Sequence, residues 1–252
     1  MKLWYKNPAK QWNHALPVGN ARLGAMIFGE VLNERIQLNE ETIWAGRSRD
    51  VDNPQAFEKL EQVRRLLFEE RTAEATAIAE AYLMGNPKDI LPYEALGDLF
   101  IEFVHTEEII NYQRMLDLNT AIAEISYDHN NCKFRREIFS SSVNQVMVIR
   151  LTCDQPARIS FTARLEREKD AICTAQEQDI FMIGQCDNGK GICFNAILRV
   201  IPEGGSVTTN SDNICVRDAD AVTLYFVCNS NFRDESYDIT CKKQLEQAVQ
   251  LG

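Results

Sequence analysis

The chain has 252 residues, of which 45% are hydrophobic and 25% are charged, and its formal net charge at pH 7 is −10. This composition is typical of a globular protein with one large β domain or two small domains, and no stretch is long and apolar enough for a membrane span. The negative charge disfavours nucleic acid and anionic membranes as partners, because both bind basic surfaces, and leaves a neutral small molecule or sugar compatible.

The first apolar segment, from Leu16 to Gly29, is interrupted by the polar and turn residues Gly19, Asn20 and Arg22. Residues 1–14, which precede it, contain neither a continuous apolar run nor a small-residue cleavage site. We therefore expect a cytoplasmic protein unless a leader peptide has been removed.

Glu40 and Glu41 lie beside Trp44, in a segment that leaves regular structure. An aromatic ring next to carboxylates suits contact with a sugar. The alternative is structural, with a glutamate in an ion pair or turn cap and Trp44 in the core. His14 follows Trp12 and is a further candidate for a site residue.

A helical pair is predicted over about residues 54–84, inserted between early strands and the main β region. Asn53 is placed as an N-cap, Pro54 as the first helical residue, and Thr72 as the cap of a second helix that ends near Gly85. The apolar residues that recur at helical spacing in the first helix are Phe57, Leu60, Val63 and Leu67.

From Asp98 onward the chain reads as a succession of short strands separated by turn signals. In the segment 158–165, apolar and polar residues alternate strictly, which is the period of a half-buried antiparallel strand. Many such strands predict a β-sandwich. Leu245, Ala248 and Val249 indicate a short amphipathic helix at the C-terminus.

The eight cysteines show no Cys-x-x-Cys spacing, and the chain has only three histidines. We therefore predict reduced thiols, no metal site and no cofactor. His129 lies in a predicted turn, where we expect it to be solvated. No pair of carboxylates stands out by spacing as a catalytic pair for sugar hydrolysis.

Several motifs are similar to a known family. They are Leu3–Tyr5, Pro8–Ala9, Trp12, Leu16–Met26 and Glu34–Gly46, followed by "YEALGDL", "YQRMLDLNTAIAEISY" and "RREIFSSSVNQVMVIRL". These motifs resemble the N-terminal domain of glycoside hydrolase family 95, the α-L-fucosidases. The likeness covers about the first three fifths of the chain in ordered motifs and only the strand pattern beyond.

The resemblance implies a mostly β fold, a large two-sheet antiparallel β super-sandwich over residues 1–238. Residues 239–252 are then the start of a helical linker to an (α/α)6 catalytic barrel of the same polypeptide. In the family the barrel carries the catalytic acid and base of an inverting hydrolysis, so no catalytic residue is assigned in this chain. The implied function is a non-catalytic domain that supports and borders the active site of an enzyme acting on fucosylated oligosaccharides, or of a related α-L-galactosidase.

The resemblance also suggests which polar groups face the barrel or border the substrate. The candidates are Asn20, Arg22, Asn39, Glu40, Trp44 and His14. The alternative is internal, with Arg22 paired to Glu40 or Glu41 inside the domain, and both stay open. Ala21 replaces a family glycine, and because Ala in a left-handed conformation costs about 1 kcal/mol relative to Gly, we expect ordinary backbone angles there.

Two other functions compete with this interpretation. A free-standing carbohydrate-binding module would use Trp12 and Trp44 as stacking platforms for sugar rings. An assembly role would follow if the barrel-facing surface were exposed, because large apolar patches promote dimerisation.

Overall fold

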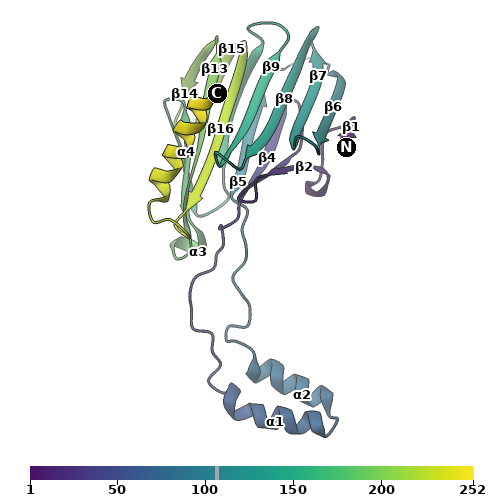
Figure 1. Ribbon diagram of the computed structural model, residues 1–252, viewed down its shortest axis with the longest axis vertical. Helices are drawn as coiled ribbons and strands as arrows, with labels where there is room; N and C mark the ends of the chain where they lie inside the picture. The colour runs from purple at the N-terminus through teal and green to yellow at the C-terminus, as the bar shows by residue number, and fades with distance from the viewer. Residues whose placement is uncertain (106–107) are drawn as a thin grey trace. The chain divides into compact units, whose positions relative to one another are not determined.

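The computed structural model describes residues 1–105 and 108–252 (Figure 1). It divides into two compact units, one formed by residues 1–43 and 94–252 and the other by residues 44–93. The larger unit is a sandwich of two antiparallel sheets, which confirms the mostly β fold predicted from the alternating pattern. No helix in the described ranges has the length and apolarity needed to cross a membrane.

The first sheet has nine strands, and every neighbouring pair in it is antiparallel. In spatial order they are β1 (Lys2–Tyr5), β6 (Ile110–Asp117), β7 (Ile122–His129), β8 (Cys132–Ser141), β9 (Val146–Cys153), β16 (Ala221–Ser230), β13 (Cys193–Glu203), β12 (Asp179–Gln185) and β11 (Ala171–Gln176). A four-residue turn, α3 (Cys186–Gly189), in which Asp187 and Asn188 have left-handed backbone angles, connects β12 to β13.

The second sheet has seven strands, also antiparallel throughout. In spatial order they are β14 (Ser206–Thr209), β15 (Asn213–Ala219), β10 (Ile159–Glu166), β5 (Gly97–Phe103), β4 (Asn33–Glu40), β3 (Leu23–Ile27) and β2 (Leu16–Gly19). A short helical turn, η1 (Trp12–His14), precedes β2.

The main core lies between the two sheets. Ile36 and Leu38 of β4, in the seven-stranded sheet, belong to the same buried cluster as Ile149 of β9 and Phe226 of β16, in the nine-stranded sheet. Because side chains alternate along each strand, one face of each sheet is apolar, and the apolar faces of the two sheets pack against each other.

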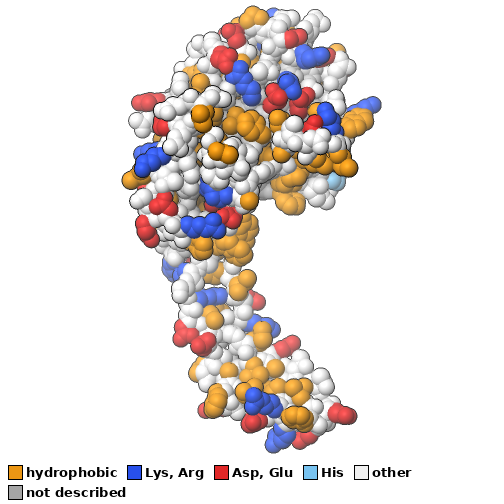
Figure 2. Space-filling model, viewed as in Figure 1, with side chains coloured by type: hydrophobic (Ala, Val, Ile, Leu, Met, Phe, Trp, Pro, Cys, Tyr) orange, Lys and Arg blue, Asp and Glu red, His pale blue; other side chains and the backbone are white. Residues whose placement is uncertain are grey.

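Helix α4 (Tyr237–Leu251) packs on the outer face of the nine-stranded sheet and confirms the predicted C-terminal helix. Its buried residues Cys241, Leu245 and Ala248 contact a second apolar cluster that includes Val227 of β16. Beside α4 the same face carries a groove of ≈ 610 Å³. Its lining includes Phe139, Val148 and Tyr225, and Figure 2 shows hydrophobic side chains gathered on this face.

The smaller unit, residues 44–93, contains the predicted helical pair, as α1 (Ala56–Phe68) and α2 (Thr72–Ile78), followed by a π-helical turn, η2 (Ala79–Leu83). The Asn53 side chain accepts a hydrogen bond from the Gln55 N–H (3.0 Å), so it caps a turn ahead of α1, not the helix itself.

The buried face of this helical pair differs from the predicted one. Val63 and Leu66 of α1 pack against Ala75 of α2, while Phe57 and Leu67 are exposed.

The first and last residues of this insertion lie close together in space. The Ala45 N–H donates to the Pro92 carbonyl (2.9 Å), and Trp44 and Tyr93 form an isolated β-bridge. Within the sandwich, the Glu94 N–H donates to the Ile43 carbonyl (3.0 Å). The chain therefore leaves β4 and returns to β5 through neighbouring points.

Candidate functional site

Strand β4 presents a carboxylate at each end of its inward face. Its buried positions are Glu34, Ile36, Leu38 and Glu40, because successive side chains of a strand point to opposite faces. Six residues of extended strand separate the two carboxylates by roughly 20 Å. Each carboxylate pairs with one arginine, Arg136 at the first end and Arg22 at the second.

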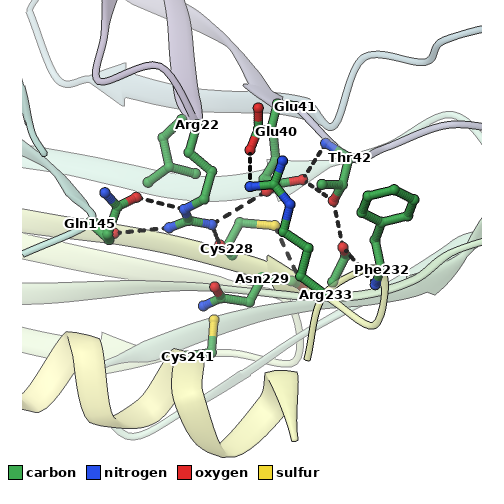
Figure 3. A network of polar contacts seen from close by, with 12 residues as sticks. Arg22, Glu40, Glu41, Thr42, Gln145, Cys228, Asn229, Phe232, Arg233 and Cys241 are labelled. Carbon is green, nitrogen blue, oxygen red and sulfur yellow. Dashed lines mark hydrogen bonds and ion pairs between the residues drawn. The ribbon is translucent and has the colours of Figure 1, made fainter. Parts of the chain in front are cut away.

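Arg22 lies in the turn between β2 and β3 and connects the two sheets. Its Nε donates to Gln145 Oε1 (2.6 Å) and its Nη2 to the Gln145 carbonyl (3.3 Å), in the turn between β8 and β9. Its Nη1 donates to the carbonyl of Cys228 in β16 and to Glu40 Oε1 (3.4 Å). Figure 3 shows the guanidinium lying between Gln145 and Glu40.

Glu40 continues this contact toward two hydroxyl groups. Its Oε2 accepts hydrogen bonds from the Thr42 N–H (2.8 Å) and the Thr42 hydroxyl (2.5 Å). The Thr42 hydroxyl lies 2.5 Å from the Ser230 hydroxyl at the end of β16. We call the group Arg22, Glu40, Thr42, Gln145 and Ser230 the Arg22–Glu40 cluster.

Asn20 holds the turn that presents Arg22. Its Oδ1 accepts hydrogen bonds from the Arg22 N–H (3.1 Å) and the Leu23 N–H (2.8 Å), and its Nδ2 donates to the Ser141 carbonyl (2.8 Å). Between them, Ala21 has φ = 76°. The expectation of ordinary angles at Ala21 is therefore wrong, because the tight turn requires a left-handed residue whichever side chain occupies it.

The other three candidate residues lie outside the Arg22–Glu40 cluster. Asn39 is half-buried on the opposite face of β4 from Glu40, across from Gly24. His14 is exposed at the end of η1, and its backbone carbonyl accepts a hydrogen bond from Arg114 (2.8 Å). Trp44 belongs to the smaller unit, where its ring meets Tyr93 edge to face at 5.0 Å between centroids.

An exposed ion pair borders the Arg22–Glu40 cluster. Arg233 Nη1 lies 2.7 Å from Glu41 Oε1, and their side chains are 66% and 36% exposed. The Arg22 and Glu40 side chains are 16% and 2% exposed. Internal pairing of Arg22 with Glu40, one of the two alternatives from the sequence, is thus present.

At the other end of β4, Arg136 and Glu34 form a fully enclosed ion pair. Arg136 Nη1 donates to Glu34 Oε2 (2.8 Å), and the Gly29 N–H donates to Glu34 Oε1 (2.8 Å). The Arg136 guanidinium also stacks on the Phe103 ring at 4.1 Å. It makes further hydrogen bonds to the carbonyls of Glu30 and Val31 and to the Tyr127 hydroxyl.

Burial raises the pKa of the Glu34 carboxyl from 4.5 to about 7, although Arg136 and the Gly29 N–H act in the opposite direction. A raised carboxyl pKa is the property of a general acid, but such a group must also reach a substrate. Glu34 has no exposed surface. The position of Glu34 therefore suits a structural role.

The pattern of β4 contained a signal that sequence reasoning missed. Glu34 shares the inward parity of Ile36 and Leu38, and a charged residue at such a position requires a buried partner. Arg136 occupies the same parity as Phe134 and Ile138 in β8. Gln145, by contrast, lies in a turn, and turn residues have no periodic pattern from which its contact with Arg22 could be predicted.

His129 differs from its expected solvated state, since it is only 6% exposed. It is the last residue of β7 and pairs with Cys132 across a two-residue turn, so strand alternation directs it inward. The eight cysteines are free thiols. Three groups close together, Cys132, Cys153 and Asp154, are of the types that ligate metals.

Comparison with known proteins adds a family model and several relatives. The model described as "Glycosyl hydrolase family 65, N-terminal domain" matches residues 3–235. "Alpha-L-fucosidase 2" of Arabidopsis thaliana is 35% identical over 259 residues, a match that covers 92% of this chain and 30% of that protein. "Probable alpha-fucosidase A" of Aspergillus niger is 27% identical, with 91% of this chain and 30% of the relative covered.

A solved structure described as a kojibiose phosphorylase from the human microbiome has the same fold. Its TM-score is 0.55 at 12% sequence identity, and the match covers 99% of this chain and 35% of that one. The chain thus spans about a third of the length of the proteins it matches. The fucosidase relatives confirm the resemblance seen in the motifs, while the family model is described under number 65, not 95.

Proposed function

Because the chain belongs to the family of glycosyl hydrolase family 65 N-terminal domains, we propose that it is the non-catalytic N-terminal domain of an α-L-fucosidase. The hydrolysis of fucosylated oligosaccharides is then performed by a catalytic domain of the same polypeptide. The observation that carries this proposal is the match over residues 3–235 together with relatives named as fucosidases that are about three times longer.

The use of the inward carboxylates supports a non-catalytic role. Hydrolysis of a glycosidic bond needs two carboxyl groups that flank the bond, about 5 to 9.5 Å apart, one of them protonated. Glu34 has the raised pKa of such an acid but is enclosed with Arg136. Glu40 is 2% exposed and binds Thr42 and Arg22. Both carboxylates join parts of the sandwich instead of facing a substrate.

Two surfaces are available to border the catalytic domain. Asn20 and Arg22 keep part of their surface exposed beside the Glu41–Arg233 pair, so this corner offers polar groups that are already held in place. The groove beside α4 offers apolar surface. We propose the catalytic domain of the same polypeptide as the occupant, because the relatives contain about twice this length of additional chain.

Activity measurements on the chain and on a chimaera test the proposal. We expect the purified chain to release no nitrophenol from an aryl α-L-fucoside. A chimaera in which this chain replaces the matching segment of the Arabidopsis relative is expected to hydrolyse the same substrate. Turnover by the chain alone, above that of a mock purification, would show that the catalytic residues lie in this chain.

A free-standing carbohydrate-binding module is the second candidate function, favoured by the exposure of Trp12 and Trp44. Trp12 is 58% exposed and Trp44 is 42% exposed, and exposed indole rings are suited to stacking on sugars. Calorimetric titration with fucose and a fucosylated lactose separates the candidates. The first proposal predicts no heat of binding, whereas a module predicts saturable heat that is lost in Trp12→Ala or Trp44→Ala.

The oligomeric state tests the surface that is proposed to meet the catalytic domain. If the groove beside α4 remains uncovered, its apolar lining favours self-association. Light scattering would then give the mass of a dimer. Substitution of Val148 by Lys on this face is expected to restore the monomer, with Thr152→Lys on the same strand as the control.

A further inference from the structure

A corner of the sandwich unrelated to the Arg22–Glu40 cluster gathers side chains that ligate metals. The Sγ atoms of Cys132 and Cys153 and a carboxylate oxygen of Asp154 all lie within 4.8 Å of one another. Cys132 begins β8, and Cys153 ends β9. Cys132 is 21 positions from Cys153 and 22 from Asp154 in sequence, so its approach to them is a product of strand pairing.

Strand register explains why the two thiols share one face. Cys153 lies directly opposite Phe134, and Cys132 lies two residues before Phe134, so both point to the same side of the sheet. Such diagonal neighbours have Cα atoms about 7 to 8 Å apart. This separation exceeds the usual span of a disulfide, which favours a bridging ion over a direct bond.

Asp154 is held against the thiols by backbone contacts. Its carboxylate accepts a hydrogen bond from the Lys133 N–H (2.8 Å), and its own N–H donates to the Lys133 carbonyl (3.1 Å). The Cys153 thiol donates to Asp154 Oδ1 (3.8 Å), a long contact with a weak donor. The carboxylate therefore keeps its position without needing the thiols.

His129 supplies an independent indication of a ligand. It is the Cα partner of Cys132, so their side chains are direct cross-strand neighbours. Its Nδ1 is buried and has no hydrogen-bond partner among the residues that the structure describes. Buried ring nitrogens are normally hydrogen-bonded, so a buried nitrogen without a protein partner calls for an explanation. Coordination of an ion would satisfy it.

We propose that Cys132, Cys153, Asp154 and His129 form a binding site for Zn²⁺. Two sulfurs, one nitrogen and one oxygen match the ligands of this borderline-soft ion, and four ligands complete its tetrahedral shell. Zinc with thiolate ligands at about 2.3 Å places neighbouring sulfurs about 3.8 Å apart, so the ligand atoms of Cys132, Cys153 and Asp154 approach by about 1 Å or less. The ring nitrogens of His129 are not within 4.8 Å of all three of these atoms, so this side chain has to move toward them when the ion binds. Binding releases the two thiol protons to solvent.

Access and charge agree with this assignment. His129 and Cys132 line two neighbouring surface cavities of ≈ 450 and ≈ 280 Å³, which give an ion a path to the thiols. Two thiolates and a carboxylate exceed the charge of Zn²⁺ by one negative unit. Lys133 lines the first cavity together with Glu108 and Asp128, whereas Arg158 and Arg217 line the second together with Asp218, so the surplus of basic side chains lies in the second cavity. The ion would tie the β7–β8 turn to the end of β9.

Titration of the full chain with Cd²⁺, a zinc substitute, tests the site. The reduced, chelator-treated protein is expected to show thiolate-to-cadmium absorption in the ultraviolet that saturates at one equivalent and is displaced by Zn²⁺. We expect Cys153→Ser to weaken binding by about 100-fold and Asp154→Asn by about 10-fold, as loss of a ligand requires. The matched control is Cys173→Ser, a half-buried thiol on β11 that should leave the titration unchanged.

Thermal melting provides a second readout. Zn²⁺ is expected to raise the Tm of the wild-type chain and of Cys173→Ser, but not that of Cys153→Ser. Cys153 and Asp154 lie nearer the surface than the buried Cys132, so these variants carry the test if Cys132→Ser does not fold. Absence of saturable absorption, or equal loss in Cys173→Ser and Cys153→Ser, would refute the site.

Discussion

Two arginine–glutamate pairs anchor the opposite ends of strand β4, and they differ in how far they are removed from water. Arg136 and Glu34 are 2% and 0% exposed, whereas Arg22 and Glu40 are 16% and 2% exposed. The Arg136–Glu34 contact is also shorter, at 2.8 Å against 3.4 Å. Each pair links strands of one sheet to elements of the other.

The difference teaches what a charged group inside a sandwich can be used for. Removing the enclosed pair from water is unfavourable, and this desolvation raises the pKa of Glu34. Hydrogen bonds to backbone carbonyls and stacking on an aromatic ring fix the position of the Arg136 guanidinium. The Arg22–Glu40 cluster keeps one arginine edge accessible and shares it with turns. The first pair suits a fixed connection between sheets, and the second leaves part of its arginine accessible at the surface.

The largest expected effect comes from removing Arg136. Arg136→Met leaves the Glu34 carboxylate buried without its partner, and we expect the free energy of unfolding to fall by about 3–5 kcal/mol. Denaturation by urea, followed by circular dichroism at pH 7, measures the loss. The control is Arg135→Met, whose exposed pair with Glu124 should contribute about 1 kcal/mol or less. Equal losses in the two variants would mean that the enclosed pair contributes no more to stability than the exposed pair.

The second effect is a pH dependence that belongs to Glu34. Its folded pKa, about 7, is above the value of 4.5 in the unfolded chain, so the folded state binds more protons between these values. Stability from this group is therefore present below pH 4.5 and is lost as the pH rises toward 7, by on the order of 3 kcal/mol. Urea denaturation across pH 4.5–7.5 is expected to show this fall.

Glu34→Gln provides the comparison, because it removes the titration while retaining the side-chain shape. Burial lowers the pKa of His105 from 6.5 to about 4, so His105 contributes the opposite trend, a rise of stability between these pH values. Subtracting the Glu34→Gln profile from that of the wild type cancels His105. A difference that stays constant with pH would contradict the assignment to Glu34.

A smaller loss is expected at the Arg22–Glu40 cluster. Arg22→Met removes hydrogen bonds to Gln145 and the Cys228 carbonyl, and we expect a loss of about 1–3 kcal/mol. Arg22→Lys should fall between wild type and Met, since an ammonium group cannot reproduce the planar fork. If Arg22→Met costs as much as Arg136→Met in the same urea assay, the two ends of β4 are energetically alike.

The smallest effect is a gain. Ala21 has φ = 76°, and replacing it with Gly relieves a left-handed alanine, which is expected to raise stability by about 1 kcal/mol. The same substitution at Ala171, in strand β11, should lower stability because Gly weakens a strand. Equal signs in the two thermal melts would show that the turn before Arg22 carries no strain.

The fold was predictable because strands repeat every second residue. The alternation in residues 158–165 matches β10, whose inward residues Ile159, Phe161, Ala163 and Leu165 are buried. The helix α1 was found by its spacing, but its buried face only in part: Val63 packs against α2, whereas Phe57 is exposed and Leu66 takes part in the contact instead. Periodicity locates an element more reliably than it identifies the partner that covers it.

The candidate site was predictable only in part. Asn20, Arg22 and Glu40 were identified from family motifs, and the structure brings them together. The contacts with Gln145 and Ser230 join residues more than a hundred positions away in sequence, a distance over which no local pattern extends. His129 was misjudged because the two-residue turn after it is so tight that strand alternation continues to its last residue.

The insertion between β4 and β5 begins and ends at one point of the sandwich, where the Glu94 N–H donates to the Ile43 carbonyl. A connection with adjacent ends can change length at little entropic cost, because loop closure depends only weakly on the number of residues. The sandwich can therefore accept different modules in place of residues 44–93 while the register of β4 and β5 is retained. This point is therefore suited to protein engineering, because another segment can replace the insertion without changing the two sheets.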